Sequence, residues 1–237
     1  MLRTSLLDES ERLAEQLLSK NQVEVLSRTA EDITAGIESA DLKVDLTPFW
    51  KLDARIGGIG GYCMPLRPFG NPFPSGIARE LFRPIQYAAA EIEYHGNPLT
   101  ARESIRNSGM YLEAVTKFWV NRTSSILDTN RYKRLTLGQS IAVLKKRGLV
   151  TDGLAESLDA SLVLYNQAKH AVTQREDRDR MFTVGDALVV YICARILGMR
   201  ILKPYYDEIL RGIPEYERDF PGVNMNGSNP PCSGAGV

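Results

Sequence analysis

Residues 187–202, ALVVYICARILGMRIL, constrain the fold more than any other part of the sequence. The segment is shorter than the roughly 20 apolar residues that a membrane-spanning helix needs. Arg195 stands in its middle, where a charge inside a bilayer is costly. We therefore interpret the segment as a buried core helix and predict no association with a membrane. Arg195 is then partly buried and needs a partner.

Apolar residues recur at helical spacing through most of the chain, and no stretch alternates with a period of two for long enough to indicate a sheet. A chain of 237 residues can bury a real core. The late helices are joined by short connections, which favours antiparallel neighbours. The predicted fold class is all-α: an antiparallel helical bundle with additional N-terminal helices and an irregular Pro/Gly-rich loop.

Two predicted helices begin with a capping-box pattern, one with Thr100 and Glu103 and the other with Thr136 and Gln139. The first pattern opens a long helix that contains Gly109. Because glycine is costly in the middle of a helix, we expect Gly109 to allow close contact with a neighbouring helix.

The chain divides into four regions. Residues 1–45 form the N-terminal helices. Residues 46–76 contain many prolines and glycines, so we predict no regular element there, while their aromatic residues indicate an ordered loop that packs over the core. Residues 77–211 form the helical bundle. Residues 212–237 are poor in apolar residues and are predicted to be a disordered tail.

Charge is unevenly distributed, although the formal net charge is zero. Acidic residues dominate from Asp8 to Asp45, and basic residues dominate from Arg122 to Arg147. A local basic face can steer phosphates whatever the net charge, so Lys145, Lys146 and Arg147 are candidate RNA-binding residues, together with Arg178 on the later charged connection. The alternative is that the acidic and basic helices face each other or a second copy of the chain.

The sequence predicts neither a metal site nor a cofactor. Its three cysteines are far apart and lack the spacing of a zinc site or a disulfide framework. A metal shared by Glu91 and His95, which lie one helical turn apart, is the alternative. Acidic residues Asp8, Glu9 and Glu11 interrupt the apolar stretch that a signal peptide would need, so we predict a cytoplasmic protein.

The hexad YNQAKH, residues 165–170, ends a leucine-striped helix and contains one of only two histidines. Tyr165 continues the leucine stripe and is predicted to point into the bundle. Asn166 and His170 lie four residues apart, so they share a helix face at the edge of that stripe and can reach solvent. This pair is either a working polar site or an ordinary helix end, where histidine meets the last free carbonyl groups.

The order of elements resembles that of the HEPN (higher eukaryotes and prokaryotes nucleotide-binding) superfamily over roughly residues 100–203. The resemblance rests on a capped helix ending in KKRGLV, a short turn, a helix ending in Asn-x-x-x-His, a charged connection and a final apolar helix. It implies a homodimer in which two Arg-polar-x(3–5)-His motifs meet in a cleft. It also implies a metal-independent endoribonuclease of toxin–antitoxin, phage-defence or RNA-processing systems.

Asn166 and His170 match the family motif, while Tyr165 stands at the arginine position. In the implied chemistry, the RNA 2'-hydroxyl attacks the neighbouring phosphate, histidine moves a proton and arginine stabilises the charge on the phosphoryl oxygens. Tyrosine supplies no positive charge at neutral pH. Catalysis is therefore expected to be weakened or lost unless another cation enters the site, and the candidates are Arg195 and Arg178.

Three functions follow as hypotheses. The first is a non-catalytic module that binds RNA or a protein, such as a cognate antitoxin. The second is a metal-independent endoribonuclease with His170 as general acid or base and Asn166 as its partner. The third is an unrelated helical bundle that binds a small ligand under the 46–76 loop.

Overall fold

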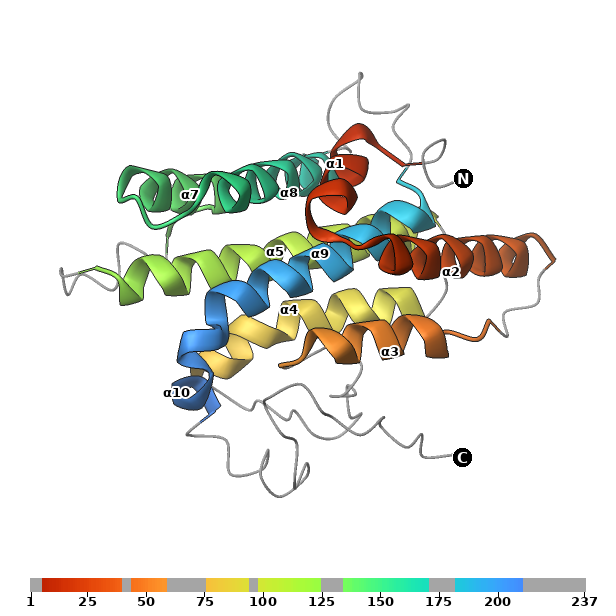
Figure 1. Ribbon diagram of the computed structural model, residues 1–237, viewed down its shortest axis with the longest axis horizontal. Helices are drawn as coiled ribbons and strands as arrows, with labels where there is room; N and C mark the ends of the chain where they lie inside the picture. Colours follow the sequence, from red (N-terminus) through yellow and green to blue (C-terminus); the bar gives the residue numbers. More distant parts are fainter. Residues whose placement is uncertain are drawn as a thin grey trace.

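The computed structural model describes residues 6–39, 44–58, 76–93, 98–124, 134–170 and 182–210. Within these ranges the protein is helical and contains no strand, and the helices pack against one another as a bundle (Figure 1). The predicted all-α class is therefore confirmed. The described elements are α1 (Asp8–Leu17), α2 (Lys20–Ser39), α3 (Thr47–Ile56), α4 (Gly76–Glu93), α5 (Pro98–Arg122), α7 (Leu137–Lys146), α8 (Asp152–His170), α9 (Val184–Leu202), the 3-10 turn η3 (Lys203–Tyr205) and α10 (Tyr206–Leu210).

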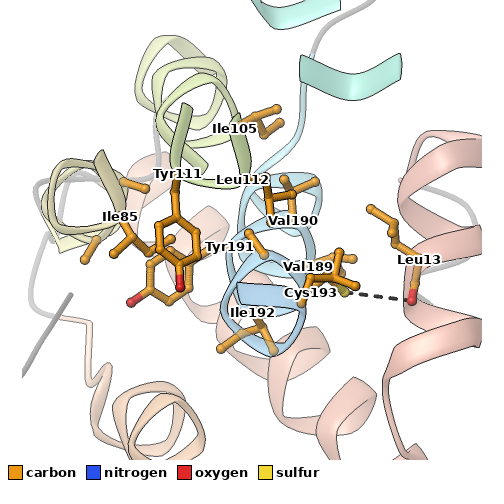
Figure 2. Close-up of a cluster of buried hydrophobic side chains, with 14 of the residues drawn as sticks. Leu13, Ile85, Ile105, Tyr111, Leu112, Val189, Val190, Tyr191, Ile192 and Cys193 are labelled. Atoms are coloured by element: carbon orange, nitrogen blue, oxygen red, sulfur yellow. Dashed lines mark hydrogen bonds between the residues drawn. The ribbon is translucent and has the colours of Figure 1, made fainter. Parts of the chain in front are cut away.

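Helix α9 is the centre of the bundle, as residues 187–202 predict. Almost all of its side chains are buried, and it packs on α1, α2, α3, α4 and α5. Figure 2 shows part of this core, where Leu13 of α1, Ile85 of α4 and Tyr111 of α5 surround the α9 residues 189–193. An apolar surface on every side of a helix is stable in water only when neighbours cover all of it.

The other helices form layers around α9. Helices α7 and α8 lie on one side of α5 and α9, and α3 and α4 lie on the other (Figure 1). Helix α5 contacts α4, α7, α8 and α9 and so connects these layers. Helix α5 contacts α8, and through this contact the YNQAKH hexad, residues 165–170, lies against the part of α5 that contains Arg102 and Gly109.

Two helix starts test the predicted caps. Thr136 accepts the Gln139 N–H and Gln139 binds back to the Thr136 N–H, so this capping box is confirmed. The prediction at Thr100 was wrong, because α5 already begins at Pro98. Proline is favoured in the first turn of a helix, where its missing N–H costs nothing, and this signal took precedence over the capping-box pattern.

Helix α3 contradicts the prediction that no regular element runs through residues 46–76. It begins with Pro48 in its first turn, where proline is tolerated, and it ends at Gly57, which has a φ of 80°. No breaker lies between these two positions. Its buried face carries Phe49 and Trp50, whose ring centroids are 4.7 Å apart, so this part of the loop does pack on the core. Residues 59–75 and the predicted tail, 212–237, lie outside the described residues.

None of the helices described by the structure combines the length and the apolar character that crossing a membrane requires.

Candidate functional site

Tyr165 packs into the interface between α8 and α5, as its place on the leucine stripe predicts. Its side chain is 5% exposed and lies directly over Gly109 of α5. A Cβ atom added to Gly109 would lie 2.3 Å from Tyr165 Cδ2, which is far inside van der Waals contact. The close helix contact predicted for Gly109 is therefore confirmed, and Tyr165 is the side chain that fills it.

The Tyr165 hydroxyl meets a carboxylate rather than a cation. It donates to Glu113 Oε2 at 3.4 Å, and the same carboxylate also receives Lys117 Nζ at 2.6 Å and the Leu137 N–H at 3.3 Å. Burial, followed by the charge of Glu113, raises the pKa of Tyr165 to about 12. The position that the HEPN motif gives to arginine is thus occupied by a neutral phenol at physiological pH.

Asn166 and His170 lie on the solvent side of α8. Both side chains are exposed, in contrast to the neighbouring Tyr165 and Ala168, which face the bundle. Val163 is on the same outer side and is 39% exposed. The shared, accessible helix face predicted for Asn166 and His170 is therefore present.

Three cations lie close to the last turns of α8. Lys169 Nζ lies 5.5 Å from the centroid of the Tyr165 ring. Arg102 of α5 donates from Nε to the Ala168 carbonyl at 2.8 Å, and Arg106, one turn further along α5, bonds Glu103 at 3.0 Å. The positive charge of Arg106 reaches Tyr165, because it acts to lower the pKa of that phenol.

The sequence interpretation missed Arg102 and Arg106. A signal for them exists, since Arg102, Arg106, Gly109 and Glu113 follow one another in steps of four, three and four and so share one face of α5. Only the contact between Gly109 and Tyr165 shows that this face is turned towards α8.

Arg195 does not replace the motif arginine within this chain. Its side chain is 1% exposed, and its Nε donates to Asp53 Oδ1 at 2.6 Å while Nη2 donates to the Gly57 carbonyl at 2.9 Å. Both partners belong to the α3 side of the bundle, whereas α8 lies on the opposite side of α9 (Figure 1). Burial acts to lower the pKa of Arg195, but Asp53 and nearby tyrosines raise it, so the guanidinium stays charged in a structural pair.

The predicted RNA-binding cations are not gathered at the hexad. Lys145, Lys146 and Arg147 lie at the end of α7. Lys145 pairs with Asp159 in the middle of α8, so that pair is separated from His170 by about 16 Å of helix at 1.5 Å per residue. Arg147 donates to the Val120 carbonyl. Arg178 lies outside the described residues.

Among the residues placed by the structure, no group of three or more His, Cys, Asp or Glu side chains could hold a metal ion. Glu91 lies in α4, and burial followed by the charge of Glu103 raises its pKa. His95, its proposed partner, falls between the described ranges 76–93 and 98–124.

A second polar feature is a surface hollow of about 720 Å³ between α2, α3 and α9. The start of the 46–76 region lines it, through Pro48, Lys51 and Arg55. The predicted small-ligand pocket under the whole 46–76 loop stays a prediction, because residues 59–75 lie outside the described residues.

In the part of the chain that the structure describes, the protein is an all-helical bundle, and the polar end of α8 carries an outward-facing Asn/His pair. Comparisons with family models, curated proteins and solved structures found no match for this chain.

Proposed function

We propose that the protein is a HEPN-like helical module that binds RNA at the end of α8 without cleaving it. One observation carries the proposal: Arg102, Arg106 and Lys169 lie around the last turns of α8, beside an exposed Asn166 and His170. We refer to these five residues as the α8-end surface. A prokaryotic toxin–antitoxin or phage-defence system is the setting that the family resemblance implies.

Binding is supported by the kind of groups present. Arginine and lysine supply the phosphate contacts that dominate affinity for nucleic acid, while asparagine and histidine can bond to bases or sugars. Glu103 offsets part of the charge of Arg106. This ion pair is exposed, and because water screens the attraction between the two charges the pair is weak. An incoming phosphate can therefore compete for Arg106.

Loss of cleavage is supported by the chemistry at position 165. Stabilising the developing phosphoryl charge needs a preorganised cation or donor at the reacting group. The Tyr165 side chain is instead buried and its hydroxyl is directed at Glu113, while Lys169 lies over the ring and does not replace it. His170 alone can move protons but cannot supply the missing charge.

A homodimer is the assembly that we propose for this surface. The exposed face of α8 combines Val163, which is 39% exposed, with Asn166 and His170. A second copy packed there would cover the Val163 side chain and place two Asn/His pairs in one cleft. A cognate antitoxin or another protein would use the same face in place of the second copy.

Fluorescence anisotropy of a labelled single-stranded RNA of about 20 nucleotides tests the binding proposal. Affinity is expected to fall steeply with salt. The double variant Arg106→Gln/Lys169→Gln should bind at least about tenfold more weakly and show a smaller salt dependence, because two phosphate contacts are removed. Lys203→Gln, on the exposed η3 turn, is the matched control for loss of a surface charge. Absence of binding at about 50 mM salt, or equal affinity of both variants, would overturn the proposal.

A further inference from the structure

The hollow between α2, α3 and α9 has the size and composition of a small-molecule site. Its volume of about 720 Å³ lies within the roughly 300–1,000 Å³ that is usual for such pockets. It is built where the start of α2 and the exposed face of α3 meet the C-terminal half of α9, and the three helices contact one another pairwise. Its lining residues come from well-packed helices and need no rearrangement to form the hollow.

Much of the wall is apolar. Val25 comes from α2, Leu52 and Ile56 from α3, and Ile196 and Met199 from α9. Leu52 is buried, and the others are partly exposed towards the hollow. This wall can take up a flat or branched apolar group, and its burial would contribute about 25 cal/mol per Å² of surface removed from water.

The polar part of the wall is positively charged. Lys51, Arg55 and Arg200 line the hollow, and among the residues that the structure describes no Asp or Glu does. Neither arginine forms an ion pair with any residue of the described ranges. Like charges that line one hollow repel one another, and a bound anion would relieve that repulsion.

Two carboxylates near these cations are already engaged. Asp45, which precedes α3, accepts the Thr47 N–H at 2.9 Å; hydrogen bonding with Thr47 is the main cause of its lowered pKa, and Lys51 adds a smaller effect. Arg200 also borders a second hollow near α8, where Glu156 bonds Gln16 at 3.2 Å. The α2 side carries Ser19 and Gln22, which cap the start of that helix.

We infer that this hollow binds a small organic anion, with a phosphate or sulfonate head held by Lys51, Arg55 and Arg200 and an apolar body on Leu52, Ile196 and Met199. The site shares no residue with the α8-end surface. The inference therefore does not depend on RNA binding, and neither result predicts the other.

Two fluorescent probes of one ring system test the inference. 1-Anilinonaphthalene-8-sulfonate carries the anionic head, and N-phenyl-1-naphthylamine lacks it. The natural protein should bind the sulfonate more tightly than the neutral probe. Arg55→Gln/Arg200→Gln should weaken sulfonate binding at least about tenfold while changing binding of the neutral probe less than about twofold, because only the head loses its partners.

The matched control is Arg134→Gln/Lys146→Gln, which removes two exposed charges elsewhere. Circular dichroism should show the same helicity and unfolding temperature for both double variants. Competition by 1-naphthyl phosphate, with little effect of inorganic phosphate, would support the combined requirement for head and body. Three results would overturn the inference: no sulfonate binding to the natural protein, equal weakening in the control, or equal loss of both probes in Arg55→Gln/Arg200→Gln.

Discussion

Gly109 is the residue on which the contact between α5 and α8 depends. Its missing side chain leaves the space that the Tyr165 ring occupies, and an added Cβ would lie 2.3 Å from that ring. We expect Gly109→Ala to destabilise the protein by about 1–2 kcal/mol, because overpacking outweighs the better helix propensity of alanine. Urea unfolding measures the change.

Gly153→Ala is the matched control for Gly109→Ala. Gly153 also lies in a helix, but an added Cβ there would meet no atom within 4 Å. This variant should gain up to about 1 kcal/mol from helix propensity alone. Equal stability changes in the two variants would show that α5 and α8 are not in close contact at Gly109.

The raised pKa of Tyr165 predicts that the free energy of unfolding falls at alkaline pH. Its folded pKa of about 12 is above the value near 10 of an unfolded tyrosine. Between these values the folded state keeps a proton that the unfolded state has lost, so the contribution is fully present below pH 10 and disappears as pH rises through 12. Unfolding free energies across this window should fall less steeply for Tyr165→Phe than for the natural protein. An equal dependence of unfolding free energy on pH in the two proteins would show that the Tyr165 phenol is exposed to solvent.

At the scale of elements, the buried carboxylate of Asp186 joins two helix starts. It accepts the Thr183 N–H at 2.8 Å in the capping box of α9, and it accepts the Leu7 N–H, at the start of α1, at 2.9 Å. Asp186→Ala leaves both N–H groups without this partner and should cost about 2–4 kcal/mol. Thr136→Ala, in the exposed capping box of α7, should cost only about 1 kcal/mol. Similar costs in thermal unfolding would contradict the link between α1 and α9.

The elements show what local sequence can predict. The apolar run at 187–202, the capping box at Thr136 and the close contact at Gly109 were each predicted from local sequence, and the structure confirms all three. Helix α3 was missed because prolines and glycines were counted over the whole region. Pro48 and Gly57 lie only at the start and the end of this helix, where they are compatible with it. The start of α5 was misplaced by three residues, because Thr100 was taken as the N-cap although the helix begins at Pro98.

The candidate site was only partly predictable. The orientation of Tyr165, Asn166 and His170 follows from the helix period, so their burial and exposure were predicted correctly. The pairing of Arg195 with Asp53, and the approach of Arg102 to α8, join residues far apart in sequence. Such pairings depend on which helices become neighbours, and no local pattern specifies this.

At the scale of the whole molecule, the formal net charge is zero, yet the described residues form two separate cationic surfaces. One lies at the end of α8 against α5, and the other lines the hollow between α2, α3 and α9. The buried pair of Arg195 and Asp53 lies within the core between α9 and α3 and contributes charge to neither surface. The two surfaces can therefore be tested, and can fail, independently.

Binding without cleavage is tested most directly by one gel-shift experiment at low salt in EDTA, with labelled mixed-sequence RNA and saturating protein. We expect a shifted complex whose RNA is full length on a denaturing gel, both for the natural protein and for His170→Ala. Products with 2',3'-cyclic phosphate ends that disappear in His170→Ala would show a working ribonuclease instead. RNA that stays unshifted with folded protein would contradict RNA binding itself.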